Sequence, residues 1–338
     1  MFELARQNLA LREDAAVGFA PPREAAPRVE RLRAPLRAGV IVNARSHRNR
    51  GDPARTVGSD NVMTAHPEST ADLDAILAGF AARGVELLVV DGGDGTVRDV
   101  LTRAAEHFPA GLPRLAVVPS GKTNALALDL GAPRGWTLEA ALAAAETGRV
   151  RRRAPLEIWR AGATSAEMKG FLFGTGAFVR STQAAQRAHG VGLVDALAVG
   201  VTLAAGVAKT LFGGARDGWR AGEPTRLALD GGPAADGARF LVMASTLERL
   251  PLGLQPFGPP RPGVKVLDVD APPRRLLRAL PILLAGRDAR WLPAAGYRRA
   301  DAETLALSLD GDFVLDGEIY PGGELTLRRG EPLEFVAP

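Results

Sequence analysis

The sequence predicts an α/β protein with a doubly wound parallel sheet in its first half and a mostly antiparallel β-sandwich in its second half. Between residues 37 and 150, short apolar runs alternate with stretches of helical spacing, which is typical of parallel sheets covered by helices. After residue 150, short strand candidates follow one another between Gly and Pro turns, which indicates antiparallel pairing. With 338 residues, 46% of them hydrophobic, the chain is long enough for two cores.

The elements of the first half follow in order after residues 1–36, which we expect to form an N-terminal extension. The run AGVIVN (38–43) predicts a buried strand, and ADLDAILAGFAARG (71–84) predicts a helix that Gly84 closes. The elements expected next are a strand at 86–90, a helix at 96–108, a strand at 115–119 and a helix at 141–150. This alternation defines an expected first domain at 37–150.

Polar loops follow three of these strands, at the edge where doubly wound sheets bind their ligands. They are expected at 43–51, 91–96 and 120–124. In GGDG (92–95), the glycines let the backbone approach a ligand, and free amides at the start of the next helix favour an anion such as phosphate. Asp94 would repel that phosphate unless Mg²⁺ lies between them. The loop therefore predicts a metal-bound nucleotide, with a glycine turn and a capping aspartate as the alternative.

The second half, residues 151–338, is expected to form a β-rich domain whose final strands can return to the first domain. Its strand candidates are 151–160, 168–178, 225–230, 238–245, 263–269, 304–310, 313–318 and 324–329. The apolar run 196–208 is shorter than the roughly 20 residues that span a bilayer, so a core helix is favoured over a membrane span.

Composition narrows the classes of function. The sequence has no cysteine, which excludes disulfides, zinc-thiolate sites and a thiol nucleophile. A content of 5% aromatic residues and the lack of a recognisable module argue against nucleic-acid binding. The N-terminus lacks the order of charged, apolar and small residues that is typical of a signal peptide. We therefore expect a cytoplasmic protein.

Four motifs occur in order along the chain: VNARS (42–46), GGDGT (92–96), VVPSGKTNALALDLG (117–131) and LDGE (315–318). Together with the β-rich second half, they resemble the diacylglycerol kinase catalytic superfamily, which also contains sphingosine, ceramide and bacterial lipid kinases. The resemblance covers about residues 37–338 and implies a first domain similar to that of NAD kinases. It also implies ATP and Mg²⁺ as cofactors, and transfer of the γ-phosphate to a primary hydroxyl of a membrane lipid.

The resemblance implies roles for individual residues. Those expected at the nucleotide are Asn43, Ser46, Thr64, Gly92, Gly93, Asp94, Gly95, Thr96, Gly121, Thr123 and Asn124. Asp94 is expected to reach Mg²⁺, and Asp72 to belong to the same metal network. Asp316 would be the general base that takes the proton of the lipid hydroxyl, with Glu318 supporting it. Asp310, in the similar LDGD six residues earlier, is its rival.

Two positions depart from the family pattern. The second glycine-rich loop, at 120–124, and the residue that follows it contain the sequence GKTNA where the family has GTxND. Ala125 therefore stands at an expected acidic position. We hypothesise that Lys122 neutralises a phosphate instead; a solvated surface lysine is the alternative. In addition, GGDGT is followed by VRDV rather than VNEV.

The second loop also bears on the substrate, because its departure from the bacterial diacylglycerol kinase pattern favours ceramide or a sphingoid base. A soluble-substrate kinase of the NAD kinase type and a non-catalytic nucleotide- or lipid-binding regulator remain the alternatives.

A basic amphipathic segment, 273–290, is the feature that bears on partners. Its arginines are Arg274, Arg275, Arg278, Arg287 and Arg290, and its leucines Leu276, Leu277, Leu280, Leu283 and Leu284 are expected on one helical face that Pro281 kinks or breaks. Such a segment suits peripheral docking on anionic lipids at the inner face of the membrane. Packing of the leucines on the β domain is the alternative, and a homodimer is left open.

Overall fold

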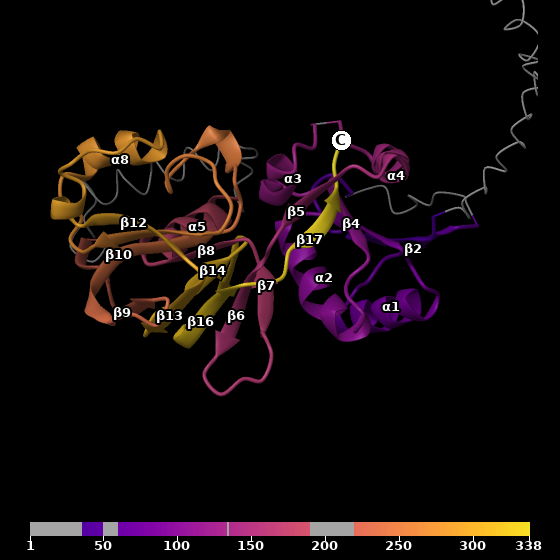
Figure 1. Ribbon diagram of the computed structural model, residues 1–338, viewed down its shortest axis with the longest axis horizontal. Coiled ribbons are helices and arrows are strands. Elements are labelled where there is room, and N and C mark those ends of the chain that lie inside the picture. The colour runs from indigo at the N-terminus through magenta and orange to yellow at the C-terminus, as the bar shows by residue number, and fades with distance from the viewer. Residues whose placement is uncertain (1–35, 50–59, 134, 190–219) are drawn as a thin grey trace, which may run out of the picture. The chain divides into compact units, whose positions relative to one another are not determined.

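Six strands form the first sheet, in the order β2-β1-β3-β4-β17-β5 (Figure 1). Their bounds are Ala38–Val42 (β1), Val62–Ala65 (β2), Leu87–Gly92 (β3), Arg114–Pro119 (β4), Val150–Arg153 (β5) and Leu333–Val336 (β17). β1 to β4 and β17 run parallel, and β5 pairs with β17 in the antiparallel direction. Helices follow β2, β3 and β4 along the chain, and the strands pair in the parallel direction, so the predicted parallel sheet is confirmed.

The computed structural model describes residues 36–49, 60–133, 135–189 and 220–338. Residues 36–338 form one compact unit. The expected N-terminal extension, except for its last residue, and the apolar run 196–208 lie outside the described residues. Within the described ranges, no helix is long and apolar enough to cross a membrane.

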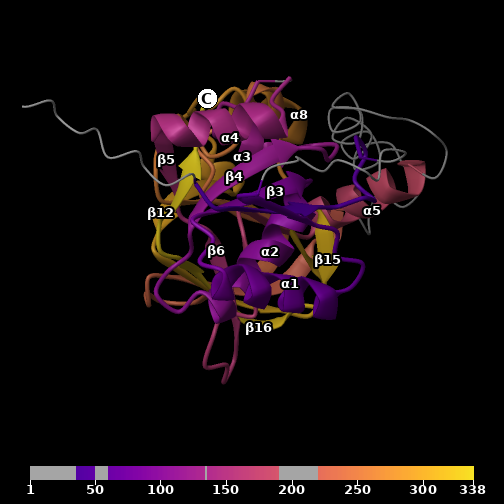
Figure 2. The same cartoon turned by 90° about the vertical axis from the view of Figure 1, so that its right-hand side faces the viewer.

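Helices cover both faces of the first sheet, as Figure 2 shows. Their bounds are Thr70–Ala82 (α1), Asp94–His107 (α2), Ala125–Asp129 (α3) and Leu138–Thr147 (α4). Leu88 and Val90 of β3 pack toward α1 and α2, whereas Leu87 and Val89 pack toward α4. Because both faces of the strand are buried, its sequence is a continuous apolar run rather than an alternating one.

The order of the strands creates a switch point between β1 and β3. From β1 the chain moves outward to β2, and it then returns to place β3 and β4 on the other side of β1. Ligands of doubly wound sheets bind at the carboxyl ends of the strands at such a point. Here those ends lead into Asn43 and Gly93.

Eleven strands form the second sheet, and all their pairings in the described residues are antiparallel. Their bounds are Leu156–Arg160 (β6), Met168–Gly170 (β7), Leu172–Thr175 (β8), Glu223–Leu229 (β9), Ala235–Ser245 (β10), Val264–Asp270 (β11), Tyr297–Ala302 (β12), Thr304–Leu309 (β13), Phe313–Leu315 (β14), Glu318–Tyr320 (β15) and Gly323–Arg329 (β16). Among the residues of this half that the structure describes, the α-helices are Ala177–His189 (α5) and Leu276–Leu284 (α8).

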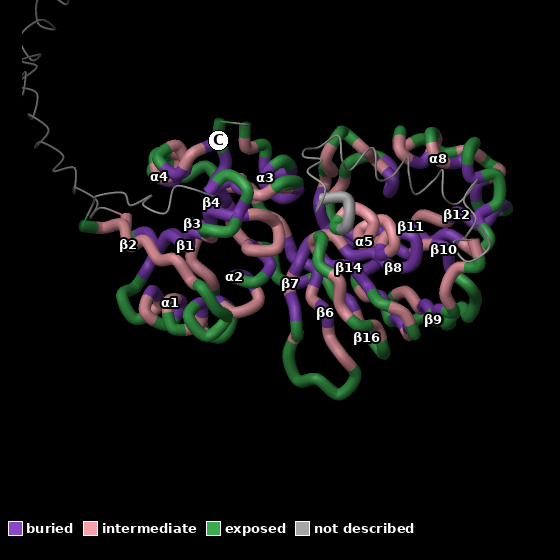
Figure 3. Tube along the Cα trace, turned by 180° about the vertical axis from the view of Figure 1, so that it is seen from behind, coloured by how far each residue is buried: buried purple, intermediate pink, exposed green. Residues whose placement is uncertain are grey.

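The second sheet divides at the long strand β10, whose one edge pairs with β11 and whose other edge pairs first with β9 and then with β8. Alternate residues from both branches meet in one core, for example Phe173 of β8, Val266 of β11 and Leu307 of β13. Buried residues lie along the strands of both sheets in Figure 3. The predicted antiparallel β domain is therefore confirmed.

Several predicted elements have different bounds. The helix expected at 141–150 ends at Thr147, because Gly148 adopts the left-handed conformation with a φ of 72°. The strand expected at 151–160 is two strands, β5 and β6, that belong to different sheets and are separated by Ala154 and Pro155. Segment 168–178 likewise divides into β7, β8 and the start of α5.

Candidate active site

Two glycine-rich loops touch at the carboxyl end of the first sheet. A Cβ atom on Gly121 would lie 2.4 Å from the Cα of Gly93, and one on Gly93 would lie 3.1 Å from the Cα of Gly121. No side chain fits between the two backbones. The close approach of the loops at 91–96 and 120–124 thus requires glycine at both positions, in addition to any role at a ligand.

The end of β1 joins these loops through Asn43. Its amide Nδ2 donates to the Thr96 hydroxyl at 2.8 Å, and its backbone N–H donates to the Asp91 carbonyl at 2.9 Å. The Ser46 hydroxyl donates to the Asn43 carbonyl at 2.8 Å, which closes the turn after the strand. A Cβ atom on Gly92 would lie 2.6 Å from the Cβ of Thr96. The structure therefore brings together the predicted residues Asn43, Ser46, Gly92 and Thr96.

Sequence reasoning missed the buried polar residues that link the three loops. The Asp91 carboxylate, fully buried at the end of β3, accepts hydrogen bonds from Asn49 Nδ2, at 3.0 Å, and from the Ser120 hydroxyl. The Ser120 carbonyl accepts from the Arg48 N–H at 3.0 Å. A usable signal was present, because Asp91 and Ser120 each end an apolar strand directly before a glycine motif.

Asp94 is the first residue of α2, and its side chain contacts the segment directly after the loop at 120–124. Its carboxylate accepts hydrogen bonds from the backbone N–H groups of Ala125, at 2.9 Å, and Leu126, at 3.2 Å. Burial raises the pKa of Asp94, and these hydrogen bonds oppose that rise. Asn124 closes the loop beside it, because its side chain accepts from the Gly121 N–H and donates to the Gly121 carbonyl. Thus Ala125 contributes its amide to the site.

Asp316 lies in the turn between β14 and β15, with a left-handed φ of 48°. Its carboxylate accepts hydrogen bonds from the backbone N–H groups of Phe171, at 3.1 Å, and Leu172, at 2.9 Å. Burial, followed by the negative charge of Asp94, raises the pKa of Asp316 to about 7. The two carboxylates are thus close enough to repel each other, although 221 residues lie between them in the sequence.

Gly170 is a further residue that sequence reasoning missed. A Cβ atom at this position would lie 2.5 Å from Oδ2 of Asp316 and 2.7 Å from Cγ of Leu315. A side chain at this position, next to the two amides that bind Asp316, would therefore displace Asp316 or Leu315. Its signal was a glycine inside the strand candidate 168–178.

Some predicted residues lie outside this cluster. Asp72 is exposed at the start of α1, where its carboxylate accepts from the N–H groups of Ser69, at 3.0 Å, and Glu68, at 3.3 Å. It forms a capping box with Ser69. Its place in the metal network stays a prediction. Thr64 lies within β2, and its buried hydroxyl has no hydrogen-bond partner among the described residues.

The predicted residues at the rim of the site are exposed. Lys122 and Thr123 lie at the surface of the second loop, and Gly95 follows Asp94 in α2. Glu318 is exposed at the start of β15, and the hydrogen bonds to the Asp316 carboxylate come from backbone amides instead. Asp310 is exposed after β13, where it lines a hollow with Thr225 and Ser308.

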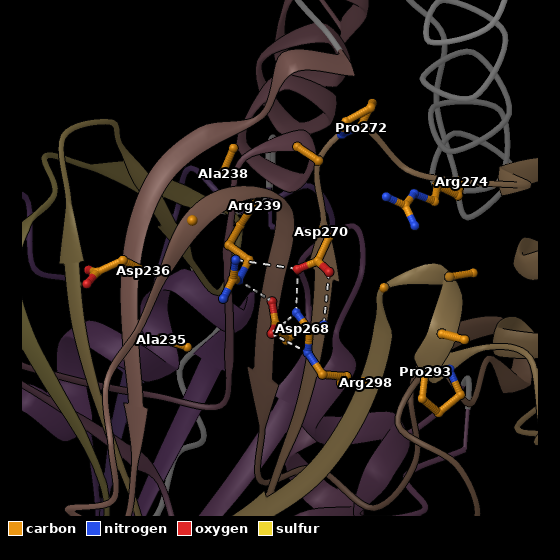
Figure 4. Close-up of a pocket in the computed structure, with 15 residues that line it drawn as sticks. Ala235, Asp236, Ala238, Arg239, Asp268, Asp270, Pro272, Arg274, Pro293 and Arg298 are labelled. Atoms are coloured by element: carbon orange, nitrogen blue, oxygen red, sulfur yellow. Dashed lines mark hydrogen bonds and ion pairs between the residues drawn. The ribbon is translucent and has the colours of Figure 1, made fainter.

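A hollow of about 620 Å³ in the second half of the chain contains none of the candidate site residues (Figure 4). Arg239 and Arg298 line it together with Asp268 and Asp270. Arg239 forms an ion pair with Asp268 at 2.9 Å, and Arg298 bonds Asp268 at 2.7 Å and Asp270 at 2.9 Å. These two arginines and two aspartates thus pair with one another within the hollow.

The donor set at Asp94 and Asp316 fits Mg²⁺ in one respect. Mg²⁺ prefers oxygen ligands and is usually held by one or two carboxylates together with substrate phosphates and water. A cation also relieves the repulsion between the two carboxylates. Within the described ranges, no three acidic or histidine side chains converge as a complete metal site. Phosphate and water oxygens would therefore supply the remaining ligands.

Comparisons with known proteins agree with this arrangement. The family model of the diacylglycerol kinase catalytic domain matches residues 37–157. A curated relative from Enterobacter sp. (strain 638), named "Probable lipid kinase YegS-like", is 31% identical over 111 residues, which are 33% of this chain and 30% of the relative. The match thus spans less than a third of that relative's length.

Solved structures extend the likeness to the second half of the chain. The structure of a diacylglycerol kinase from Bacillus anthracis str. Sterne has a TM-score of 0.59 at 15% identity, covering 89% of this chain and 97% of that one. A second structure from the same organism has a TM-score of 0.62 at 16% identity, with the same coverage. In sequence over residues 37–157, and in fold over most of its length, the chain resembles the diacylglycerol kinase catalytic superfamily, as its four motifs predicted.

Proposed function

We propose that the protein is an ATP- and Mg²⁺-dependent lipid kinase, which transfers the γ-phosphate of ATP to a primary hydroxyl of a membrane lipid. The electrostatic interaction between Asp94 and Asp316 carries this proposal. Asp94 lies in a glycine loop of the type that binds phosphate. Asp316 is a partly buried carboxylate, and desolvation together with the Asp94 charge raises its pKa to about 7. A general base is most effective when its pKa lies near the working pH.

In this mechanism the first-turn amides of α2 bind phosphate oxygens, because free N–H groups at a helix N-terminus favour anions. Asp94 would hold Mg²⁺, which neutralises charge on the transferring phosphoryl group when bound. The lipid oxygen attacks the γ-phosphorus, the bond to the β-phosphate oxygen breaks, and ADP leaves. Asp316 takes the proton of the hydroxyl, and its two backbone donors hold the carboxylate in place during the transfer.

The acceptor is proposed to be ceramide or a sphingoid base rather than diacylglycerol. This preference rests on the second loop, GKTNA, which departs from the pattern of the bacterial diacylglycerol kinases. Lys122 is exposed in that loop. We propose that its ammonium neutralises a phosphate and so compensates for the acidic metal-network residue that Ala125 replaces.

A peripheral contact with anionic lipid at the inner face of the membrane is the second part of the proposal, and α8 supports it. Its Leu276, Ala279 and Leu283 are buried in the core, so the leucines do not share one face as expected. Leu277 points outward with 61% of its surface exposed, near the exposed arginines 274, 275 and 278. An exposed leucine among arginines suits the boundary between headgroups and acyl chains. The homodimer stays a prediction.

Transfer of labelled γ-phosphate from ATP tests the kinase. The acceptors are ceramide, sphingosine, diacylglycerol, phosphatidylglycerol and NAD, presented to the wild type and to Asp94→Asn, Asp316→Asn and Asp310→Asn. We expect a lipid product that the first two variants lose and Asp310→Asn keeps. Phosphorylated NAD would favour the soluble-substrate kinase. Absence of any product, together with measurable ATP binding, would favour the non-catalytic regulator.

Liposome sedimentation tests the membrane contact. Replacing Arg274, Arg275 and Arg278 by Glu should abolish binding to vesicles with anionic lipid, because charge repulsion replaces attraction. Arg226→Glu is the control, since Arg226 is also well exposed but lies on β9. Unchanged binding by the triple variant would contradict the contact at α8.

A further inference from the structure

Arg98 is a buried cation of α2 that the mechanism does not use. It is 6% exposed, and a buried guanidinium must find acceptors to offset its desolvation. Its Nε and one terminal nitrogen donate to Asp99 Oδ1 at 3.1 and 2.8 Å. Its other terminal nitrogen donates to the Leu315 carbonyl at 3.2 Å. Arg98 therefore reaches from the phosphate-loop helix to the residue directly before Asp316.

Arg98 also contacts the second strand of the same hairpin. Its guanidinium carbon lies 5.4 Å from the ring centroid of Tyr320 in β15, within the range of a cation–π contact. The Tyr320 ring stacks on Phe313 of β14 with centroids 5.5 Å apart. One side chain thus contacts both strands that flank the turn of Asp316.

We propose that Arg98 is a positioning residue, which clamps the β14–β15 hairpin to α2 and so sets the place of Asp316 relative to the phosphate loop. The inference rests on the proposed function, in which Asp316 is the base. It also gives a role to the arginine of VRDV, the position where the family has asparagine.

The other contacts of the turn come from the second half of the chain. The Asp316 N–H donates to the Leu172 carbonyl at 2.9 Å, and Gln186 of α5 donates to the Gly317 carbonyl at 3.3 Å. These bonds hold the turn to its own domain but not to the glycine loops. Of the groups named here, Arg98 alone joins the hairpin to α2 by a hydrogen bond. Its positive charge also opposes the repulsion between Asp94 and Asp316.

The test compares Arg98→Met and Arg98→Lys with Arg103→Met. Arg103 lies on the same helix but is paired with Asp74 at 3.1 Å, away from the hairpin. We expect kcat of Arg98→Met to fall by about 10- to 100-fold, since a displacement near 1 Å can cost about 100-fold, while KM for ATP stays unchanged. Arg98→Lys should recover part of kcat, because lysine keeps the charge and can donate to one of the two acceptors.

Hydrogen exchange supplies a readout that does not depend on catalysis. The amides of 171, 172 and 316 should exchange faster in Arg98→Met than in Arg103→Met. Equal exchange and equal kcat in these two variants would overturn the inference. So would a loss shared equally by kcat, ATP binding and thermal stability in both Arg98 variants, since that indicates general unfolding. Activity retained by Asp316→Asn would instead refute the proposed base, while the exchange comparison would still decide whether Arg98 clamps the hairpin.

Discussion

Replacing Gly170 by alanine should displace the Asp316 carboxylate without changing any group that takes part in the chemistry. The new Cβ would lie 2.5 Å from Oδ2 of Asp316, where ordinary contacts begin at 3.4 Å, so the carboxylate must withdraw by about 0.9 Å. It cannot rotate away freely, because the amides of Phe171 and Leu172 hold it. A misplacement of about 1 Å can cost roughly 100-fold in rate, equivalent to about 2.7 kcal/mol of barrier.

Steady-state kinetics and thermal unfolding of Gly170→Ala measure this effect. We expect kcat to fall about 100-fold with KM for ATP unchanged, and the free energy of unfolding to fall by about 1–3 kcal/mol from overpacking. Gly135→Ala is the matched control, because a Cβ at Gly135 meets no atom within 4 Å. A wild-type kcat in Gly170→Ala would refute the claim that the position of Asp316 limits the reaction.

Three further outcomes are expected. In Gly121→Ala the new Cβ would lie 2.4 Å from the Gly93 backbone. If about 1.4 kcal/mol of this strain falls on the nucleotide-bound state, KM for ATP should rise by about tenfold. An unchanged KM would contradict the contact between the loops. Because the pKa of Asp316 is raised to about 7, its base form is present above that pH and lost below it. The value of kcat/KM should therefore fall about tenfold per pH unit below pH 7. A flat profile down to pH 5 would exclude Asp316 as the base. Lys122→Ala should weaken nucleotide binding or turnover, and kinetics identical to the wild type would identify Lys122 as a surface residue.

The first sheet and its loops could be predicted because their signals are local. Buried parallel strands are continuous apolar runs, and the glycine motifs stand directly at their ends. The family resemblance implies that Asp72 belongs to the metal network, whereas the local pattern indicates a helix cap. Ser69 precedes it by three residues, the spacing of a capping box, and the structure has that box.

The pairing of distant strands could not be predicted, because it depends on contacts that no local pattern contains. The segment 151–160 has the composition of one strand, yet β5 and β6 belong to different sheets. The final strands are expected to be able to return to the first domain, but no local pattern identifies β4 and β5 as the partners of β17. The domain boundaries at 37, 150 and 151 remain predictions. The approach of Asp316 to Asp94 followed from the family resemblance and not from residue spacing.

The place of Asp316 relative to the glycine loops depends on α2. The first turn of this helix contains Asp94, and Arg98 in the next turn donates to the Leu315 carbonyl. Further along the helix, the Thr102 hydroxyl accepts from the Lys169 N–H at 3.0 Å, in the strand that precedes Phe171. Since one helix contacts both the turn of Asp316 and the strand that leads to its amide donors, a small rotation of α2 would move the two carboxylates relative to each other. Substitutions along this face should therefore alter kcat more than the affinity for ATP.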